Sequence, residues 1–357
     1  MTLVARLLAG ALGCAILGAC ATPGDRPFAE QDADLRGYAR LLESGFTGDA
    51  AFAVPGKPDT IYYGDSAPEE AATRTIEGWP WASVTKQVIA VLVMREVEDG
   101  QFSLGSDVGT WIRPLRGRGL SVEDLLRHRS DLPNPDDSAP GDDGFPSFYT
   151  SEANPLAYCT GQGEAPAVGG GASNNCDYIV LGAVLEAATG TSLDLLLAQG
   201  IGLDAGWINT SFLEPGSERA FAARTDAEAK RIAGYGASGA LVGPLDDILA
   251  FDQALMSGRL LSDSALARLW QSDAASGSLA LGQWVFQASL DGCDAPVRIV
   301  ERRGGIGKFQ TRNIILPDRG IAVALATDQG DFEFGEVRTG SGPMHDVLSE
   351  LACQSGR

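Results

Sequence analysis

The apolar residues between positions 84 and 97 recur at the spacing of a helix that is buried on most of its sides. Residues three or four positions apart lie on one face of a helix. Asp99-Gly100 interrupts the pattern, so we expect the helix to end at about Glu98. We take this helix as the centre of the fold. Its apolar positions are Val84, Val88, Ile89, Val91, Leu92, Met94 and Val97.

Further helices are predicted on both sides of the central helix. Residues 30–45 form the first, with Gly45 as its stop. Ser121 is typical of a helix cap, because acidic residues follow it in the first turn. Other helices are expected over 178–188, 193–198, between Pro244 and Gly258, over 263–270 and near 343–352. The apolar face of the 30–45 helix would consist of Leu35, Tyr38, Leu41 and Leu42.

Strand patterns occur near both ends of the chain. Residues 50–64 predict a hairpin around a Pro-Gly-Lys-Pro turn, and Pro317-Asp318-Arg319-Gly320 predicts a second turn. Strands are expected over 281–289, 297–303, 311–316 and 321–327. Strands at both ends and helices between them predict an α/β (α+β) fold with one antiparallel sheet built from both chain ends. The sheet would come from about 30–82 and 281–357, and the mostly helical insert from about 83–280.

Composition limits the classes of function. The 357 residues carry a net charge of −20, which argues against nucleic-acid binding because that function needs a basic face. Residues 134–172 are rich in Pro, Gly, Asp and Ser and lack periodicity. Loops of this length in a compact domain are usually functional or disordered, and we expect this one to be ordered and to overhang the site.

The N-terminus predicts an export signal and a lipid anchor. An apolar stretch from Leu7 to Ala19 follows Arg6 and is too short to span a membrane as a stable helix. Leu17-Gly18-Ala19-Cys20 resembles a bacterial lipobox, which makes residues 1–20 a lipoprotein signal peptide and Cys20 the lipidated residue. An ordinary secretory signal is the alternative. Residues 21–29 would be a tether, and 30–357 a single domain that faces the periplasm, with the outer membrane favoured.

Four cysteines remain after the signal segment. In an exported chain they predict two disulfides, and three pairings are possible. We favour Cys159–Cys176, which closes a short loop, together with Cys293–Cys353, which pins the C-terminus. Zinc is not expected, because His128 and His345 are the two histidines of the chain and no Cys-x-x-Cys occurs.

Ser83 and Lys86 form a candidate nucleophile and base at the start of the central helix. Residues i and i+3 share a helix face, so Lys86 can reach the Ser83 hydroxyl. A lysine shielded from water has a lowered pKa and can accept the proton of a serine. The free N–H groups at a helix N-terminus suit a developing oxyanion. By itself Ser-x-x-Lys is a weak signal, and a cap serine with a surface lysine is the alternative.

Three later motifs strengthen the signal because they occur in a fixed order. Together with Ser83-Val84-Thr85-Lys86 they resemble the serine beta-lactamase and penicillin-binding-protein superfamily over roughly residues 35–350. The similarity is to the class C-like branch, which includes class C beta-lactamases, D-alanyl-D-alanine carboxypeptidases, D-amino-acid amidases and esterases. The motifs are Ser130-Asp131-Leu132-Pro133 after Leu-Leu-Arg-His, Ser173-Asn174-Asn175 before a Leu-Gly helix, and Arg302-Arg303-Gly304 on a strand.

The resemblance implies roles for the motif residues. Ser173 would pass a proton to the leaving group, and Asn175 would bind Lys86 and substrate. The backbone N–H groups of Ser83 and Gly305, which follows Gly304, would hold the oxyanion. His128 is expected to tie a turn together rather than to act as a base.

Two motifs depart from the usual pattern of the family. The tyrosine of the second motif is Ser173 here. Arg302 stands where the third motif usually has lysine or histidine, and it keeps the positive charge but cannot shuttle protons. It would attract a substrate carboxylate or steady the site; a salt-bridged strand residue is the alternative.

Two functions of different classes fit these features. The first is an exported serine hydrolase that acts through an acyl-enzyme on small esters, amides or D-amino-acid peptides, without a metal or organic cofactor. The second is a non-catalytic envelope protein that binds a ligand or partner on the same fold. The altered second and third motifs favour the binding protein, whereas retention of both Ser83 and Lys86 favours the hydrolase.

Overall fold

The computed structural model describes most of the chain after the tether. The predicted signal segment, the tether and Cys20 lie outside the described residues. So does part of the 134–172 loop. The described ranges are 32–64, 78–141, 145–150, 154–161, 173–214, 226–273 and 277–353.

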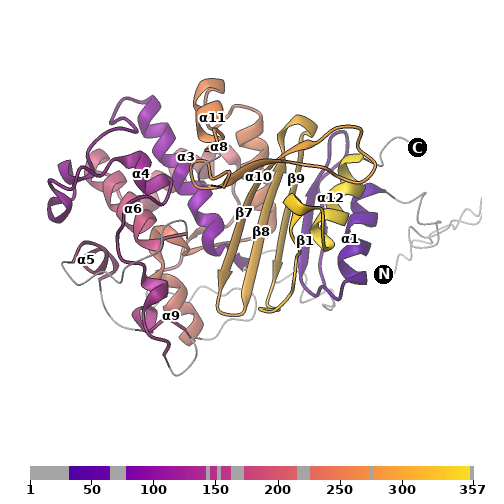
Figure 1. The fold of residues 1–357 in the computed structure, drawn as a ribbon, viewed down its shortest axis with the longest axis horizontal. Helices are drawn as coiled ribbons and strands as arrows, with labels where there is room; N and C mark the ends of the chain where they lie inside the picture. The colour runs from indigo at the N-terminus through magenta and orange to yellow at the C-terminus, as the bar shows by residue number, and fades with distance from the viewer. Residues whose placement is uncertain are drawn as a thin grey trace, which may run out of the picture.

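A six-stranded antiparallel sheet forms the centre of the molecule and confirms the predicted architecture (Figure 1). Its strand order is β2-β1-β9-β8-β7-β6. The N-terminal hairpin joins the C-terminal strands where Asp49 of β1 pairs with Ala326 of β9. The strands are β1 Asp49–Ala53, β2 Thr60–Tyr62, β6 Trp284–Ala288, β7 Val297–Ile306, β8 Phe309–Leu316 and β9 Ile321–Thr327.

Helices from the two chain ends cover one face of the sheet. α1 (Ala33–Glu43) packs beside α12 (Pro343–Cys353), as Figure 1 shows. The predicted apolar face of α1 is wrong at Leu42, which is 47% exposed. Arg36 is buried instead, because its guanidinium forms an ion pair with Glu350 of α12.

The sequence of β9 shows how the sheet separates two apolar cores. Side chains alternate between the faces of a strand. Ile321, Val323 and Leu325 pack with α1 and α12, whereas Ala322, Ala324 and Ala326 face the helical region. Small side chains on that face let α10 (Leu245–Met256) pack directly on β9 and β1.

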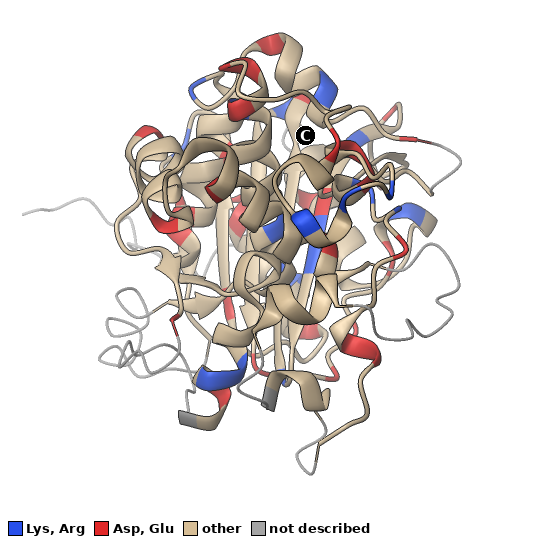
Figure 2. Cartoon of the chain, turned by 90° about the vertical axis from the view of Figure 1, so that its left-hand side faces the viewer, with Lys and Arg blue, Asp and Glu red and all other residues tan. Residues whose placement is uncertain are grey.

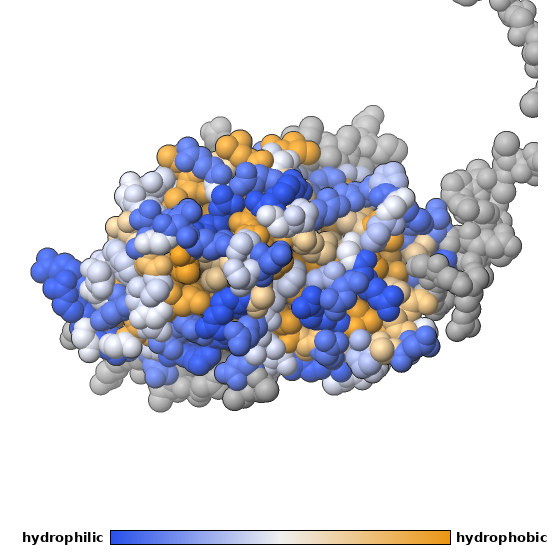
Figure 3. Space-filling model, turned by 90° about the horizontal axis from the view of Figure 1, so that it is seen from above, coloured by the Kyte–Doolittle hydropathy of each residue, from blue (hydrophilic) through white to orange (hydrophobic). Residues whose placement is uncertain are grey.

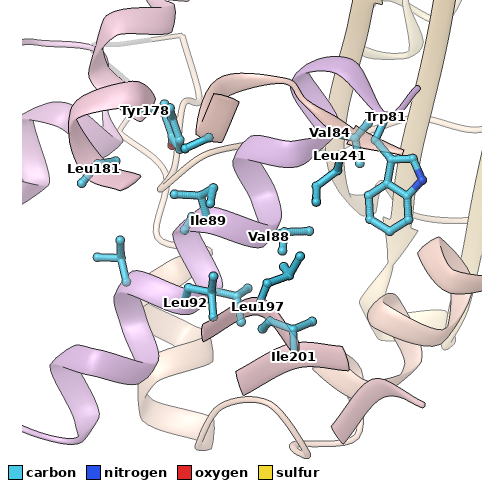
Figure 4. Packing of buried hydrophobic residues seen from close by; sticks show 14 of the residues in the cluster. Trp81, Val84, Val88, Ile89, Leu92, Tyr178, Leu181, Leu197, Ile201 and Leu241 are labelled. Atoms are coloured by element: carbon cyan, nitrogen blue, oxygen red, sulfur yellow. The ribbon is translucent and has the colours of Figure 1, made fainter. Parts of the chain in front are cut away.

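The central helix α3 (Thr85–Glu98) is buried over most of its length, as its periodicity predicts. Figure 4 shows Val88, Ile89 and Leu92 of α3 among apolar side chains of the surrounding helices. The structure also contains short helices that were not predicted. α6 starts at Asn175, which is earlier than predicted. The other helices are α4 Val122–Leu126, α5 Pro155–Thr160, α6 Asn175–Thr189, α7 Leu193–Leu197, α8 Leu203–Ala205, α9 Asp226–Gly234 and α11 Asp263–Leu269.

A second, three-stranded sheet was not predicted. Its strands are β3 (Trp79–Pro80), β5 (Leu241–Gly243) and β4 (Ser211–Phe212), in that order. They are too short for a period of two residues to show in the sequence. This sheet fixes the approach to Ser83, because the Trp81 N–H donates to Leu241 O at 2.8 Å and Trp81 Nε1 donates to Gly243 O at 3.1 Å.

Both predicted disulfide pairings are present. Cys293–Cys353 ties the segment between β6 and β7 to the end of α12. Cys159–Cys176 ties α5 to the first turn of α6. The second bond anchors part of the long loop next to Asn175, which is the residue that the second motif places in the site.

The surface is mostly polar on the faces shown. Figure 2 views the helical side, where acidic and basic residues are interspersed along the described chain. In Figure 3, hydrophilic side chains cover most of the upper face and hydrophobic ones are exposed in groups between them. No single described helix has the length and apolar composition to cross a membrane, whereas the bent pair Asn175–Thr189 and Leu193–Ala205 meets those requirements jointly.

Candidate active site

A strained turn presents Ser83 at the edge of the main sheet. Ser83 lies in the 3-10 turn η3 (Ala82–Val84), just before α3 begins. Ala82 is completely buried and has a φ of 48°, which L-residues rarely adopt and which is common at functional sites. Gly304 of β7 lies against this turn, and a Cβ at that position would sit 2.6 Å from Trp81 O. The turn and the third motif therefore fit together only with glycine at position 304.

Lys86 is buried directly beneath the serine, as the Ser-x-x-Lys spacing predicts. Its Nζ lies 2.8 Å from Ser83 Oγ, 2.7 Å from Asn175 Oδ1 and 2.7 Å from Ser238 O. Within the described residues, no carboxylate lies within ion-pair distance of this ammonium. Burial, helped by the charge of Arg302, holds the pKa of Lys86 well below its usual value. A neutral lysine amine beside a serine hydroxyl can accept its proton.

Asn175 is placed by the start of α6. The Asn174 side chain caps the helix by accepting from the Cys176 N–H at 2.8 Å, and this fixes the orientation of the first turn. The Asn175 Oδ1 faces Lys86, so the predicted contact between these two residues is present. Its Nδ2 does not point to open solvent but donates to Asp136 and to the Tyr149 hydroxyl.

Asp136 and Tyr149 are site residues that the sequence reading missed. Asp136 lies in the 3-10 turn η6 (Pro135–Asp137), and Tyr149 lies in η7 (Ser147–Thr150). The Tyr149 hydroxyl donates to Asp136 Oδ1 at 2.8 Å, and its ring stacks on Tyr235 with centroids 3.7 Å apart. The expectation that the 134–172 loop overhangs the site is met by its described residues. Loop length signalled that function, but no periodicity singled out these two positions.

Arg302 is a buried cation beneath the nucleophile. Its Nε donates to Ser83 O at 3.1 Å, its Nη2 donates to Ser173 Oγ at 3.1 Å, and its guanidinium lies 5.0 Å from the centre of the Trp284 ring. No carboxylate pairs with Arg302 among the described residues. Burial lowers its pKa to about 10, so it stays charged at neutral pH. These contacts match the expectation that Arg302 steadies the site, and the side chain is only 1% exposed.

The structure places Ser173 beside Arg302. Its hydroxyl is held by Arg302, and in the part of the chain that the structure describes it bonds neither to Ser83 nor to Lys86. Its carbonyl accepts from Asn134 Nδ2 at 3.2 Å. Proton transfer through Ser173 stays a prediction.

We expect replacement of Arg302 by glutamine to move the acid limb of Ser83 reactivity to higher pH. The positive charge of Arg302 lowers the pKa of Lys86, so its removal raises that pKa and leaves more of the lysine protonated at a given pH. The rate of labelling by a fluorophosphonate, measured from pH 5 to pH 9, would report the shift. Arg302→Lys keeps the charge and should keep the limb near its original pH. A limb that is unchanged or moved to lower pH in Arg302→Gln would contradict this electrostatic role.

A cleft opens along the end of β7, next to Gly304, which lies against the Ser83 turn. Its volume is about 580 Å³, and Gly305 lies in its wall. A Cβ at Gly305 would meet no atom within 4 Å, so the backbone of this residue borders open space. β6 pairs with β7 only as far as Glu301, which leaves the following residues without a partner from β6 on that edge. The role of Gly305 and Ser83 N–H groups as oxyanion donors remains a prediction that this arrangement permits.

His128 belongs to a buried structural cluster rather than to the reacting groups. The Asn174 N–H donates to its Nδ1 at 3.1 Å, which makes Nδ1 an acceptor. Asp177 Oδ2 lies 3.0 Å from the same nitrogen, and Ser130 donates to Asp177 Oδ1. Burial raises the pKa of Asp177 and lowers that of His128, which favours two neutral groups. The expectation that His128 ties a turn together fits this cluster.

The functional groups around Ser83 do not form a metal-binding cluster within the described residues. Across the described ranges, no three His, Cys, Asp or Glu side chains converge in an arrangement that could hold a metal ion. The chemistry of the cluster around Ser83 is that of a buried amine, an amide and a guanidinium around a hydroxyl. These groups are those expected around a serine nucleophile with a lysine base.

Comparison with known proteins shows the family. The Beta-lactamase family model matches residues 39–340, and the chain belongs to that family. The fold is similar to a D-stereospecific amidohydrolase from Streptomyces sp., with a TM-score of 0.70 and 18% identity over 91% of this chain and 99% of the other. It is also similar to a penicillin binding protein from Bacillus halodurans, with a TM-score of 0.65 and 17% identity over 88% and 98%.

A third solved structure adds a named ligand. It is the D-amino acid amidase from Ochrobactrum anthropi SV3 in complex with L-phenylalanine amide. The TM-score is 0.68, and the identity is 20% over 89% of this chain and 97% of the amidase. At these identities the structural similarity shows a shared fold, which agrees with the α/β architecture predicted from the sequence.

Proposed function

We propose that this protein is an exported serine hydrolase that forms an acyl-enzyme at Ser83. The observation that carries the proposal is the 2.8 Å contact between Ser83 Oγ and the buried Nζ of Lys86. An amine that is buried without a carboxylate partner among the described residues favours its neutral form, which is the form that accepts a proton. A protein that only binds a ligand has no need of this pair.

The proposed acyl transfer uses Ser83 as nucleophile and Lys86 as general base. Lys86 takes the hydroxyl proton as Ser83 Oγ forms a bond to the substrate carbonyl carbon. The backbone N–H groups of Ser83 and Gly305 hold the oxyanion. The bond to the leaving amine or alcohol then breaks, and the leaving group takes up the proton that Lys86 had accepted from Ser83. Water adds to the acyl-enzyme, releases the acid and restores the serine.

Small amides, esters or D-amino-acid peptides are the proposed substrates. Membership of the Beta-lactamase family supports acyl transfer, and two solved structures with this fold are named as a D-stereospecific amidohydrolase and a D-amino acid amidase. The long loop and the altered second and third motifs make a dedicated beta-lactamase the less favoured subclass. We also propose that the N-terminal segment exports the chain and that lipid on Cys20 holds it at the envelope.

The test is covalent labelling of the purified full-length protein. We expect a fluorophosphonate to add one phosphonyl group to Ser83, with loss of fluoride, and we expect Ser83→Ala to abolish the adduct. Intact mass measures the addition and peptide mapping gives its position. A parallel exposure to a penicillin shows whether a beta-lactam acylates the same serine. If neither reagent modifies folded protein with both disulfides formed, the hydrolase proposal is wrong and the binding-protein alternative takes its place.

A further inference from the structure

Asp136 stands between the candidate catalytic residues and the cleft. Both of its carboxylate oxygens lie 3.0 Å from Asn175 Nδ2, and Oδ1 also accepts from Tyr149. Asn175 in turn contacts Lys86, so two hydrogen bonds separate the carboxylate from the proposed base. Asp136 is nevertheless exposed and lines the cleft. It is therefore an acid that lines the cleft and is joined to Lys86 through Asn175.

The carboxylate has hydrogen-bonding capacity left for a ligand. Two carboxylate oxygens offer about four acceptor positions. Within the described residues, the Asp136 carboxylate accepts from one amide nitrogen shared by both oxygens and from one hydroxyl on Oδ1. No basic side chain forms an ion pair with it among the described residues. An incoming cation could thus bind Oδ2 without displacing Asn175 or Tyr149.

The other charges at the cleft do not balance Asp136. Lys308 lies 3.8 Å from Glu228 and 3.8 Å from Asp328, so two acids share this cation. Arg302 is buried against Ser83 and Ser173, which keeps it from a ligand in the cleft. A substrate carboxylate in the cleft would therefore lie near the carboxylates of Asp136 and Glu228.

The rest of the lining is apolar or aromatic. Phe145, Pro146, Tyr235 and Ile306 line the same cleft as Asp136 and Gly305. Tyr235 is held in place by its stacking on Tyr149. An apolar group of the substrate can pack here while its carbonyl lies near Gly305. The cleft thus combines two acids, Asp136 and Glu228, with Lys308, an apolar wall and the proposed oxyanion position.

We propose that the cleft selects acyl donors with a protonated amine next to the scissile carbonyl, and that Asp136 binds this ammonium group. The inference rests on the proposed function, because it places the carbonyl at Ser83. The substrates of this class are amides, esters and peptides of apolar amino acids with a free amino group. N-acylated donors lack the charge, and donors with a carboxylate near the reacting bond are repelled. Asp136 is a specificity-determining residue in this scheme.

Protection of Ser83 from fluorophosphonate labelling tests the proposal without requiring turnover. Phenylalaninamide, as each enantiomer, is compared with 3-phenylpropanamide, which lacks the amine, and with 3-phenylpropanoate. We expect the better phenylalaninamide enantiomer to protect at a concentration about 10- to 100-fold lower than the neutral amide, as for a hydrogen-bonded charge pair. Protection should weaken as the pH rises above the pKa of the ligand amine. The carboxylate should protect least.

The matched variants are Asp136→Asn and Asp137→Asn. The first removes the charge and keeps the size of the side chain, so it should erase the preference for the amine when protection is expressed relative to the labelling rate of the same variant without ligand. The second alters the neighbouring exposed acid, which does not line the cleft, and should keep the preference.

Equal protection by the amine and neutral compounds in the wild type would overturn the proposal. So would a preference that survives in Asp136→Asn, or no protection by any compound on a serine that labels. A serine that does not label at all would instead refute the proposed hydrolase function, and this inference with it.

Discussion

Replacement of Lys86 by methionine should slow fluorophosphonate labelling of Ser83 by about 10²- to 10⁴-fold, the contribution of a positioned general base. Methionine has a similar length and is apolar, so it fills the same space but cannot accept a proton. The site would also lose a buried amine that has no carboxylate partner among the described residues. The free energy of unfolding of Lys86→Met should therefore equal or exceed that of the wild type. Quenched time courses measure the rate of Ser83 labelling, and urea unfolding measures the free energy of unfolding.

Lys57→Met is the control for this experiment. Lys57 is a surface lysine whose Nζ lies 2.8 Å from Asp32, and its substitution should leave the labelling rate unchanged. Loss of reactivity with retained stability would separate a chemical role of Lys86 from a structural one. A Lys86→Met protein that labels at the wild-type rate would show that another group activates Ser83.

Replacement of Glu350 by alanine should lower the free energy of unfolding by about 3–5 kcal/mol, because it breaks the buried ion pair with Arg36. Glu350 joins α12 to α1. Its side chain is 3% exposed and accepts from Arg36 Nε at 2.9 Å and from Arg40 Nη2 at 2.9 Å. Urea unfolding with both disulfides intact measures the change.

The matched control is Glu43→Ala. Glu43 pairs with the same Arg40 at 3.1 Å, but its side chain is 61% exposed. Exposed ion pairs contribute about 0–1 kcal/mol, so this variant should unfold almost like the wild type. Equal losses for Glu350→Ala and Glu43→Ala would mean that burial of the α1–α12 ion pair has no special weight in the stability of the fold.

The fold could be predicted largely because its long elements have clear periodicity. α3 and the four C-terminal strands follow patterns that persist over many residues. The small sheet could not be predicted, since β3 has only two residues and β5 only three. Leu42 of α1 was misplaced for a different reason. Periodicity assigns leucine to the core, but the ion pair of Arg36 and Glu350 occupies buried space between the helices instead.

The candidate site, like the fold, could be predicted only in part. Ser83, Lys86 and Asn175 were predicted from motif spacing, and the structure brings them together. Asp136 and Tyr149 were missed, because they come from 3-10 turns in a loop whose contacts depend on the folded chain. The surroundings of Ser173 were missed because the reach of the Arg302 side chain across the site cannot be read from the chain order.

The pairing of β1 with β9 has a consequence for the order of folding. Asp49 pairs with Ala326, so nearly the whole chain must be synthesised before the N-terminal hairpin can join the sheet. Contacts this distant in sequence carry a large entropic cost and form slowly. The N-terminal part should therefore stay unfolded while the rest of the chain is made. A chain held open in this way is suited to passage through a membrane before it folds, which is the route that its first 20 residues predict.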